Sequence, residues 1–165
     1  MADSSPSQKP EFPPLLEVGL HPMTLGELKE LCVAQFHSSA TRQKIFDTLT
    51  KLIEKLSKLN IAGDLWIDGS FLTRKTNPAD VDIVLAINNE AYDDANEEQQ
   101  KAIDGLDSND WSGGTCDSYV LVVYDASNDL YWFGEFMRAY WIRQFGFSRG
   151  EDMKGIATVT IPPAK

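Results

Sequence analysis

The fold of this chain is decided by IDGS at residues 67–70 and DVDIVLAI at residues 80–87, with a nine-residue loop between them. Successive side chains of a strand point to opposite faces, so Asp80 and Asp82 lie on the same side. The residues after Asp82 are apolar on both faces, which predicts a strand that is buried on both sides. Two carboxylates at the end of such a strand need a divalent cation, a raised pKa or solvent to relieve their repulsion. Mg²⁺ takes oxygen ligands, commonly one or two carboxylates together with substrate phosphates.

The segment before this strand has the composition of a phosphate-binding turn. A short strand is predicted at residues 64–68, and Gly69 after it allows a ligand to approach the backbone closely. Ser70 is a favoured N-cap, and a short helix is predicted at residues 71–75, ended by Asn77-Pro78. The free N–H groups at the start of such a helix attract anions. The sequence therefore predicts a phosphate cradle beside the two carboxylates.

Gly69-Ser70, nine intervening residues and Asp80-Val81-Asp82 resemble the signature of the nucleotidyltransferases of the DNA polymerase beta type. The short chain is most similar to their small, single-domain bacterial members, and the resemblance covers about residues 41–123. It implies an α/β (α+β) fold in which a small mixed sheet is flanked by helices. Asp68 departs from the pattern, because the superfamily usually has an apolar residue at this position.

The resemblance also implies a set of site residues. Asp80 and Asp82 would be catalytic and would bind two Mg²⁺ ions, and an acid at the start of a later strand would be the third carboxylate. That strand is predicted at residues 116–124, which assigns the role to Asp117. Asp125 is the competitor, but it lies eight residues further on, so an extended strand cannot bring both acids to one site.

Gly69 and Ser70 would hold the outer phosphates of an NTP, together with Arg74 or Lys75. The implied reaction moves a nucleoside monophosphate from NTP to a hydroxyl of a macromolecular acceptor, either RNA or protein. Small proteins of this superfamily are often found in toxin–antitoxin or antiphage systems, so the resemblance implies that context as well.

Length and composition predict one globular domain. With 165 residues and 42% hydrophobic content, the chain is long enough for a core of its own. We expect a mobile tail at residues 1–18 and a single domain at residues 19–165. No signal peptide and no stretch of about 18 apolar residues is visible, which predicts a cytoplasmic protein with no membrane partner. Cys32 and Cys116 are interpreted as buried free thiols, with a disulfide as the alternative.

The net charge of −10 argues against a general electrostatic attraction to nucleic acid. Residues 76–130 contain 13 acidic residues against Lys101 alone, so the basic residues lie towards the two ends of the chain. Arg42 is either a solvated charge or a phosphate contact. The same choice, between surface solubility and binding the phosphate of a nucleotide or RNA, applies to four residues near the C-terminus: Arg138, Arg143, Arg149 and Lys154.

The remaining elements follow from periodicity and capping. Thr24 and Glu27 have capping-box spacing, and an apolar stripe marks a long second helix. An aromatic run near the C-terminus has helical spacing, and its side chains serve either core packing or base stacking. The predicted helices are residues 24–34, 40–59, 90–106 and 130–145, and a closing strand is predicted at residues 155–161.

Two other classes of function stay open. The first is a catalytically silent protein with the same fold that acts as an antitoxin or assembly partner of another protein. Asp68 and the strong negative charge favour it, because such a surface suits a basic partner. The second is a metal-binding structural domain without transfer activity, which Ca²⁺ or Mg²⁺ would stabilise without any further effect of NTP.

Overall fold

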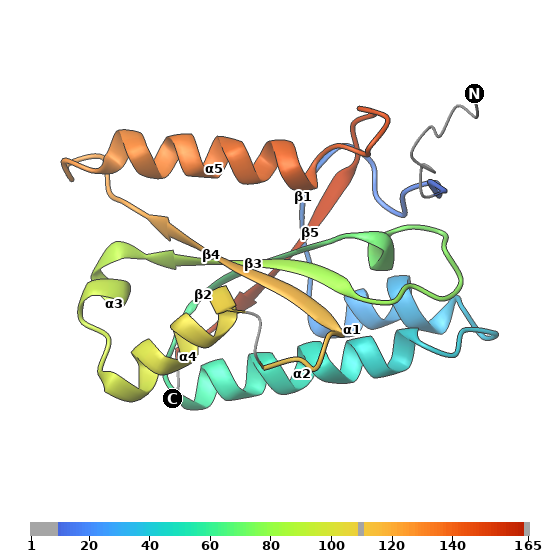
Figure 1. Cartoon of the computed structure of the whole chain (residues 1–165), viewed down its shortest axis with the longest axis horizontal. Coiled ribbons are helices and arrows are strands. Elements are labelled where there is room, and N and C mark those ends of the chain that lie inside the picture. Colours follow the sequence, from blue (N-terminus) through green and yellow to red (C-terminus); the bar gives the residue numbers. More distant parts are fainter. Residues whose placement is uncertain (1–9, 109–110, 164–165) are drawn as a thin grey trace, which may run out of the picture.

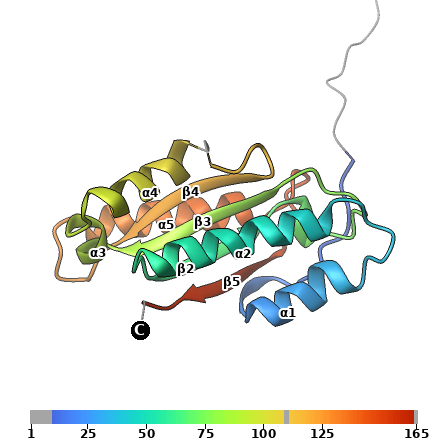
Figure 2. The same ribbon diagram turned by 90° about the horizontal axis from the view of Figure 1, so that it is seen from below.

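The computed structural model describes residues 10–108 and 111–163 and shows a five-stranded mixed sheet between two layers of helices (Figure 1). The strand order is β1-β5-β2-β3-β4. Helices α1, α2 and α4 cover one face of the sheet, and α5 lies alone across the other (Figure 2). The predicted α/β (α+β) class, with a small mixed sheet flanked by helices, is confirmed.

The elements in chain order are β1 (Gly19–Pro22), α1 (Leu25–Lys29), the π-helix η1 (Glu30–Ala34), α2 (Arg42–Lys58), β2 (Gly63–Asp68), the 3₁₀ turn η2 (Ser70–Leu72), β3 (Val81–Asn88), α3 (Asn89–Asp93), α4 (Glu97–Ser108), β4 (Cys116–Val123), α5 (Tyr131–Phe145) and β5 (Gly155–Ile161). Among the described residues, no helix is long and apolar enough to cross a membrane.

Strand β3 is the centre of the core, as its sequence predicts. Its residues Val81, Ile83, Leu85 and Ile87 are buried against the layer that contains α2. Val84 and Ala86 are buried on the opposite face, in a smaller cluster beneath α5. Strand β2 pairs with β3 in the antiparallel sense, whereas β4 pairs with it in the parallel sense. Burial on both faces therefore fixes the position of β3 between its two neighbours.

The helices on the α2 side follow the sequence patterns closely. Thr24 and Glu27 form the predicted capping box at the start of α1, and the chain continues through η1 to Ala34. The apolar stripe of α2 is buried, as its spacing indicates. Cys32 and Cys116 are buried free thiols, so the disulfide alternative is wrong.

The predicted helix at residues 71–75 is wrong in extent, because only the three-residue turn η2 forms. The chain then runs alongside the N-terminal segment: the Leu15 N–H donates to the Leu72 carbonyl, and the Arg74 N–H donates to the Pro13 carbonyl. These bonds to another segment replace the i→i+4 bonds of a longer helix. Of the predicted tail at residues 1–18, residues 1–9 lie outside the described chain, whereas residues 13–15 make these backbone contacts.

The acidic segment predicted as one helix at residues 90–106 forms two. Helix α3 ends at Asp93, and α4 begins at Glu97. The break lies at Asn96, whose side-chain oxygen accepts hydrogen bonds from the N–H groups of Glu98 and Gln99. An N-cap of this kind starts a new helix and accounts for the division.

The aromatic helix α5 is buried on one side only. Phe145 packs into the smaller core cluster, with Met137 and Trp141 against it. Core packing is wrong for its outer residues, however, since Trp132 is 68% exposed and Phe136 is 64% exposed. The helix therefore presents aromatic side chains to solvent as well as to the sheet.

Arg42 is neither the solvated charge nor the phosphate contact that the sequence offered as alternatives. Its side chain is completely buried and stacks 3.6 Å from the Phe36 ring centroid. All five guanidinium N–H groups donate to backbone carbonyls. The acceptors are the carbonyls of Cys32, Phe71, Thr73 and Lys75, at distances of 2.6–3.2 Å. Arg42 thus fixes the loop that follows Gly69-Ser70.

We predict that Arg42→Lys destabilises the protein by about 3–5 kcal/mol, because a buried ammonium cannot replace a planar fork of five donors. The free energy of unfolding in urea at neutral pH measures this loss. Arg74→Lys is the matched control: Arg74 lies in the same loop with an exposed side chain, and its replacement should change stability by less than about 0.5 kcal/mol. Equal stability of the two variants would contradict the role of Arg42.

Candidate active site

Three carboxylates stand in one row across the sheet, because strand register places them opposite one another. Asp68 at the end of β2 is the register partner of Asp82 in β3, and Asp82 is the register partner of Asp117 in β4. Register partners point to the same face, on strands about 4.8 Å apart. Asp80 directly precedes β3 and lies two residues from Asp82 on that face. We call these four residues the acidic row.

The register also separates the two candidates for the third carboxylate. Asp117 is the second residue of β4 and lies beside Asp82. Asp125 lies two residues beyond Val123, the last residue of β4, at the other end of the strand. The structure therefore brings Asp117 to the acidic row and leaves Asp125 away from it.

The acidic row lines a pocket of about 820 Å³ on the α5 side of the sheet. Of the other predicted site residues, Gly69, Ser70 and Lys75 line the same pocket. Arg74 has an exposed side chain and does not line the pocket. Aromatic side chains also line the pocket, namely Tyr140 and Trp141 of α5, Tyr119 of β4 and Phe147. The N-terminal segment at residues 10–14 closes one side.

Four basic residues near the C-terminus were predicted either to bind phosphate or to serve surface solubility, and the structure divides them. Arg149 and Lys154 line the pocket, whereas Arg138 and Arg143 do not. Arg149 and Lys154 both come from the segment between α5 and β5. Of the four residues, only these two therefore share the pocket with the carboxylates, as Lys75 also does.

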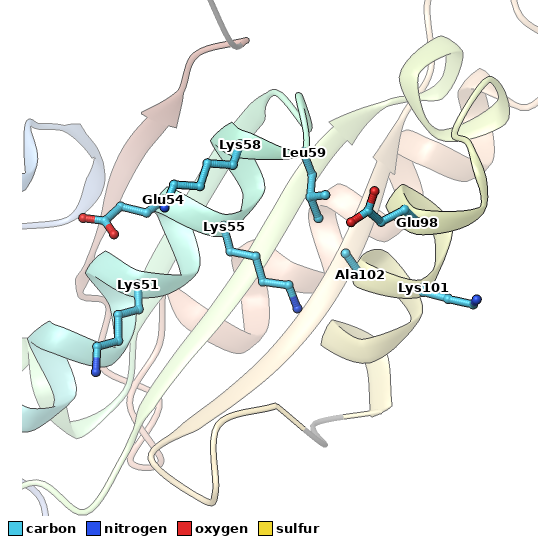
Figure 3. A pocket seen from close by; sticks show the side chains of 8 residues that line it. All are labelled: Lys51, Glu54, Lys55, Lys58, Leu59, Glu98, Lys101 and Ala102. Carbon is cyan, nitrogen blue, oxygen red and sulfur yellow. The ribbon is translucent and has the colours of Figure 1, made fainter.

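A second pocket, of about 560 Å³, lies between α2 and α4 (Figure 3). It is lined by exposed side chains of both charges, including Lys51, Lys55, Glu54 and Glu98. No residue of the acidic row borders it. It therefore offers no carboxylate cluster of the kind found on the other face of the sheet.

Asp68, the departure from the nucleotidyltransferase pattern, is held in a buried ion pair. The Lys154 Nζ lies 2.8 Å from Oδ1 and 2.6 Å from Oδ2 of Asp68, and the two side chains are 13% and 5% exposed. Burial raises the pKa of the Asp68 carboxyl, whereas the Lys154 ammonium and the Gly69 N–H lower it. Lys154 thus offsets the charge of the one acid that the resemblance leaves without a role.

Asp82 lies between Asp68 and Asp117 in the row, and the charges of the other three carboxylates all raise its pKa. Burial, followed by the charges of Asp80, Asp68 and Asp117, raises the pKa of Asp82 to about 6, and Lys154 opposes this shift. Its carboxylate lies against Gly69, where an added Cβ would overlap it. Gly69 also has φ = 79°, a conformation that favours glycine. Both observations explain why glycine precedes Ser70.

The acidic row offers the type of ligand atom that a divalent cation binds, because Mg²⁺ prefers carboxylate oxygens. With Asp68 engaged by Lys154, the carboxylates left for an ion are those of Asp80, Asp82 and Asp117. As the side chains stand, however, no three Asp, Glu, His or Cys residues within 10–108 and 111–163 are arranged to hold a metal. A metal would therefore have to draw these carboxylates together by changes of side-chain rotamer.

Sequence reasoning missed two parts of this site. One is the pairing of Lys154 with Asp68, although a buried acid at the end of a strand signals that some cation must lie nearby. The other is the N-terminal segment, whose Glu11 lines the pocket and accepts a hydrogen bond from the Gly150 N–H in the segment between α5 and β5. No periodic pattern in the sequence marks that contact.

Comparison with known proteins gives one match. A family model described as "Family of unknown function (DUF6932)" matches residues 10–160. No curated protein and no solved structure matches the chain. The matched range includes the whole acidic row and Lys154, so these residues lie inside the family's domain.

We predict that Lys154→Met destabilises the protein by about 3–5 kcal/mol, because Asp68 would be left buried without its cation. The double variant Asp68→Asn/Lys154→Met should recover most of that loss, as both charges are removed. Lys101→Met, which breaks the exposed pair with Glu97, is the control and should change stability by less than about 1 kcal/mol. Urea denaturation of the four proteins tests the coupling, and a double variant no more stable than Lys154→Met would contradict it.

We predict that Asp82→Asn stabilises the protein at pH 7.5 by about 1–2 kcal/mol. The pKa of Asp82 is about 6 when folded, against a usual value of 3.8, so the folded protein holds this proton more tightly. Stability is therefore lost as pH rises from about 4 to 6, and Asn removes this loss. Melting temperatures at pH 4 and pH 7.5 provide the measurement, and the two proteins should converge near pH 4.

Asp125→Asn is the control for this comparison, since Asp125 is an exposed acid outside the row. It should melt like the unchanged protein at both pH values. If Asp82→Asn were no more stable than the unchanged protein at pH 7.5, the repulsion assigned to Asp82 would be refuted.

Proposed function

Since the chain belongs to DUF6932, a protein family of unknown function, we propose its function from the site itself: an Mg²⁺-dependent nucleotidyltransferase. It would move a nucleoside monophosphate from NTP to a hydroxyl of RNA or protein, in a toxin–antitoxin or antiphage system. A cytoplasmic location, where NTPs are made, is part of the same proposal.

The observation that carries the proposal is the register of β2, β3 and β4. Asp82 and Asp117 stand side by side, Asp80 lies two residues from Asp82, and Gly69-Ser70 adjoins them. The resemblance to the DNA polymerase beta type rests on residues 69–82. The place of Asp117 is an independent point of agreement, since it comes from pairing with a strand outside that motif.

The phosphates of the nucleotide would lie over Gly69 and Ser70. The backbone N–H groups of Ser70 and Phe71 precede the first hydrogen bond of η2, which the Leu72 N–H donates to the Gly69 carbonyl. Lys75 and Arg149 line the same pocket and would add positive charge. Lys154 would reduce the repulsion between Asp68 and an anionic nucleotide.

The three remaining acids, Asp80, Asp82 and Asp117, would hold Mg²⁺. The ion supplies charge stabilisation to the phosphates in a reaction that depends mainly on positioning and electrostatics. In the transfer, the acceptor oxygen forms a bond to the α-phosphorus while the bond to the β-phosphate oxygen breaks and pyrophosphate leaves. Asp117 would help to take the proton of the acceptor hydroxyl.

A catalytically silent member of the same fold is the second candidate. Two observations favour it: Lys154 already occupies the acidic row as a bound cation, and the described residues include no ready three-ligand metal arrangement. Such a protein would bind a basic protein partner through its acidic surface. Co-purification of a basic protein, with no heat of nucleotide binding in calorimetry, would select this candidate.

We predict that the purified protein, given α-labelled NTPs, Mg²⁺ and cell extract, labels an RNA or a protein. Asp80→Asn/Asp82→Asn should lower labelling by about 10²-fold or more, because charge stabilisation of the phosphates is lost. Electrophoresis with and without nuclease or protease treatment identifies the acceptor.

Asp125→Asn provides the matched control, because this acid lies at the far end of β4 and should leave labelling unchanged. If the unchanged protein labelled neither RNA nor protein, this result would count against the proposed transferase activity. Equal labelling by the double variant would assign the activity to a contaminant.

A further inference from the structure

The outer face of α5 carries large aromatic side chains in solvent. We define this face by Trp132, Phe133, Phe136 and Tyr140, which are 68%, 43%, 64% and 44% exposed. The inner face of the same helix already fills the core beneath it, through Met137, Trp141 and Phe145. A helix that is apolar on both sides is normally buried on both sides. In the described chain α5 is the only helix on its side of the sheet (Figure 1), so none of the other described helices covers its outer face.

The size of this face approaches what a stable protein interface needs. A fully exposed aromatic side chain has about 200 Å² of surface. With the exposed fractions above, the four rings present on the order of 440 Å². A standard interface buries about 800 Å² per partner, of which about 65% is apolar in homodimers, or about 520 Å². Isolated exposed apolar residues need no explanation, whereas a contiguous apolar patch of several hundred Å² is often functional.

The charges at the two ends of the face complement each other. Asp129, in the turn two residues before the first residue of the helix, and Arg143, in the last turn of the helix, are each seven residues from Phe136. Seven residues are almost two helical turns, so Arg143 lies close to the line of Phe136, and Asp129 lies beyond the opposite end of the helix. Both residues are exposed. An antiparallel copy of the same helix, centred on Phe136, would bring Asp129 of each chain to Arg143 of the other.

The aromatic residues have the same symmetry. Trp132 and Tyr140 are each four residues from Phe136, so the antiparallel arrangement places Trp132 of one copy on Tyr140 of the other. A twofold axis requires a surface of this self-complementary kind. Single-stranded nucleic acid is a poorer fit, because base stacking needs a positive groove and the net charge is −10.

We propose that the outer face of α5 binds a second copy of this chain, as an antiparallel helix pair about a twofold axis at Phe136. This interface reaches the candidate active site, because Tyr140 lines its pocket. Trp132 of the second copy would then lie against the rim of that pocket. The proposal is independent of nucleotidyl transfer, since it rests on α5 alone.

Arg143 has partners within its own chain, and they are compatible with this pairing. It donates to Glu151 at 3.1 Å and stacks 4.3 Å from the Phe147 ring centroid. Both members of the ion pair are largely exposed, at 51% and 78%, so the pair contributes little to stability. A guanidinium has five donors and can bind a second carboxylate while it keeps the first.

The oligomeric state of the full chain tests the proposal. Sedimentation velocity and light scattering over a series of protein concentrations should show a dimer. Phe136→Asp should give a monomer with an unchanged circular dichroism spectrum, because a carboxylate at the twofold axis would face its own copy. Lys101→Asp on α4, on the other side of the sheet, should leave the dimer intact.

A charge exchange identifies the partner and its direction. Asp129→Arg and Arg143→Asp should each raise the dimer dissociation constant by about 10-fold or more, because like charges would meet twice. The double variant Asp129→Arg/Arg143→Asp should restore dimerisation. A monomeric unchanged protein, a dimer that survives Phe136→Asp, or a double variant as weak as the single ones would each overturn the proposal. So would oligonucleotide binding that Phe136→Asp abolishes in a protein that stays monomeric.

Discussion

Four carboxylates crowded at one end of a buried sheet are the constraint on which the rest of this molecule depends. The register of β2, β3 and β4 leaves Asp68, Asp82 and Asp117 no freedom to separate, because a shift by one residue would turn each apolar strand towards the wrong face. The core therefore enforces the repulsion. It is relieved in two ways: Lys154 pairs with Asp68, and the pKa of Asp82 rises to about 6.

Two buried cations organise the loops around this row, and they do so differently. Arg42 binds only backbone carbonyls, so it fixes the path of residues 71–75 without contributing to the pocket. Lys154 binds a carboxylate inside the pocket and joins the segment before β5 to the end of β2. Arg42 therefore fixes the conformation of the loop, whereas Lys154 offsets the charge of a carboxylate in the pocket. A loop fixed so firmly beside Gly69 presents the same backbone to any ligand, which is what a preorganised anion site requires.

The structural features that could be predicted from the sequence are those that depend on local or periodic patterns of residues. Asp82 and Asp117 both stand at the starts of strands, and strands joined by helices run parallel, so their starts meet at one edge of the sheet. The pairing of Lys154 with Asp68 depends on β5 entering the sheet between β1 and β2, and no local pattern reports that order. Arg42 was misread because its acceptors are carbonyls of an irregular loop. Periodicity placed the aromatic residues of α5 on a helix, but it cannot distinguish a face that meets the core from one that meets a partner.

The repulsion among these carboxylates bears on function, because a single substitution of Asp82 by a neutral residue would be enough to relieve it. A neutral residue at Asp82 would relieve both the desolvation and the like-charge contacts, and most stabilising changes of this sort leave the fold intact. Groups with strongly raised pKa values in a pocket are typical of sites where charge is used on a ligand. A silent protein that only displayed acidic surface to a partner would need exposed carboxylates, as in α4, not a half-buried one that lies against Gly69. The position of Asp82 therefore favours a ligand that brings positive charge into the row, and the metal–nucleotide complex proposed for this site would in addition place its phosphates over Gly69 and Ser70.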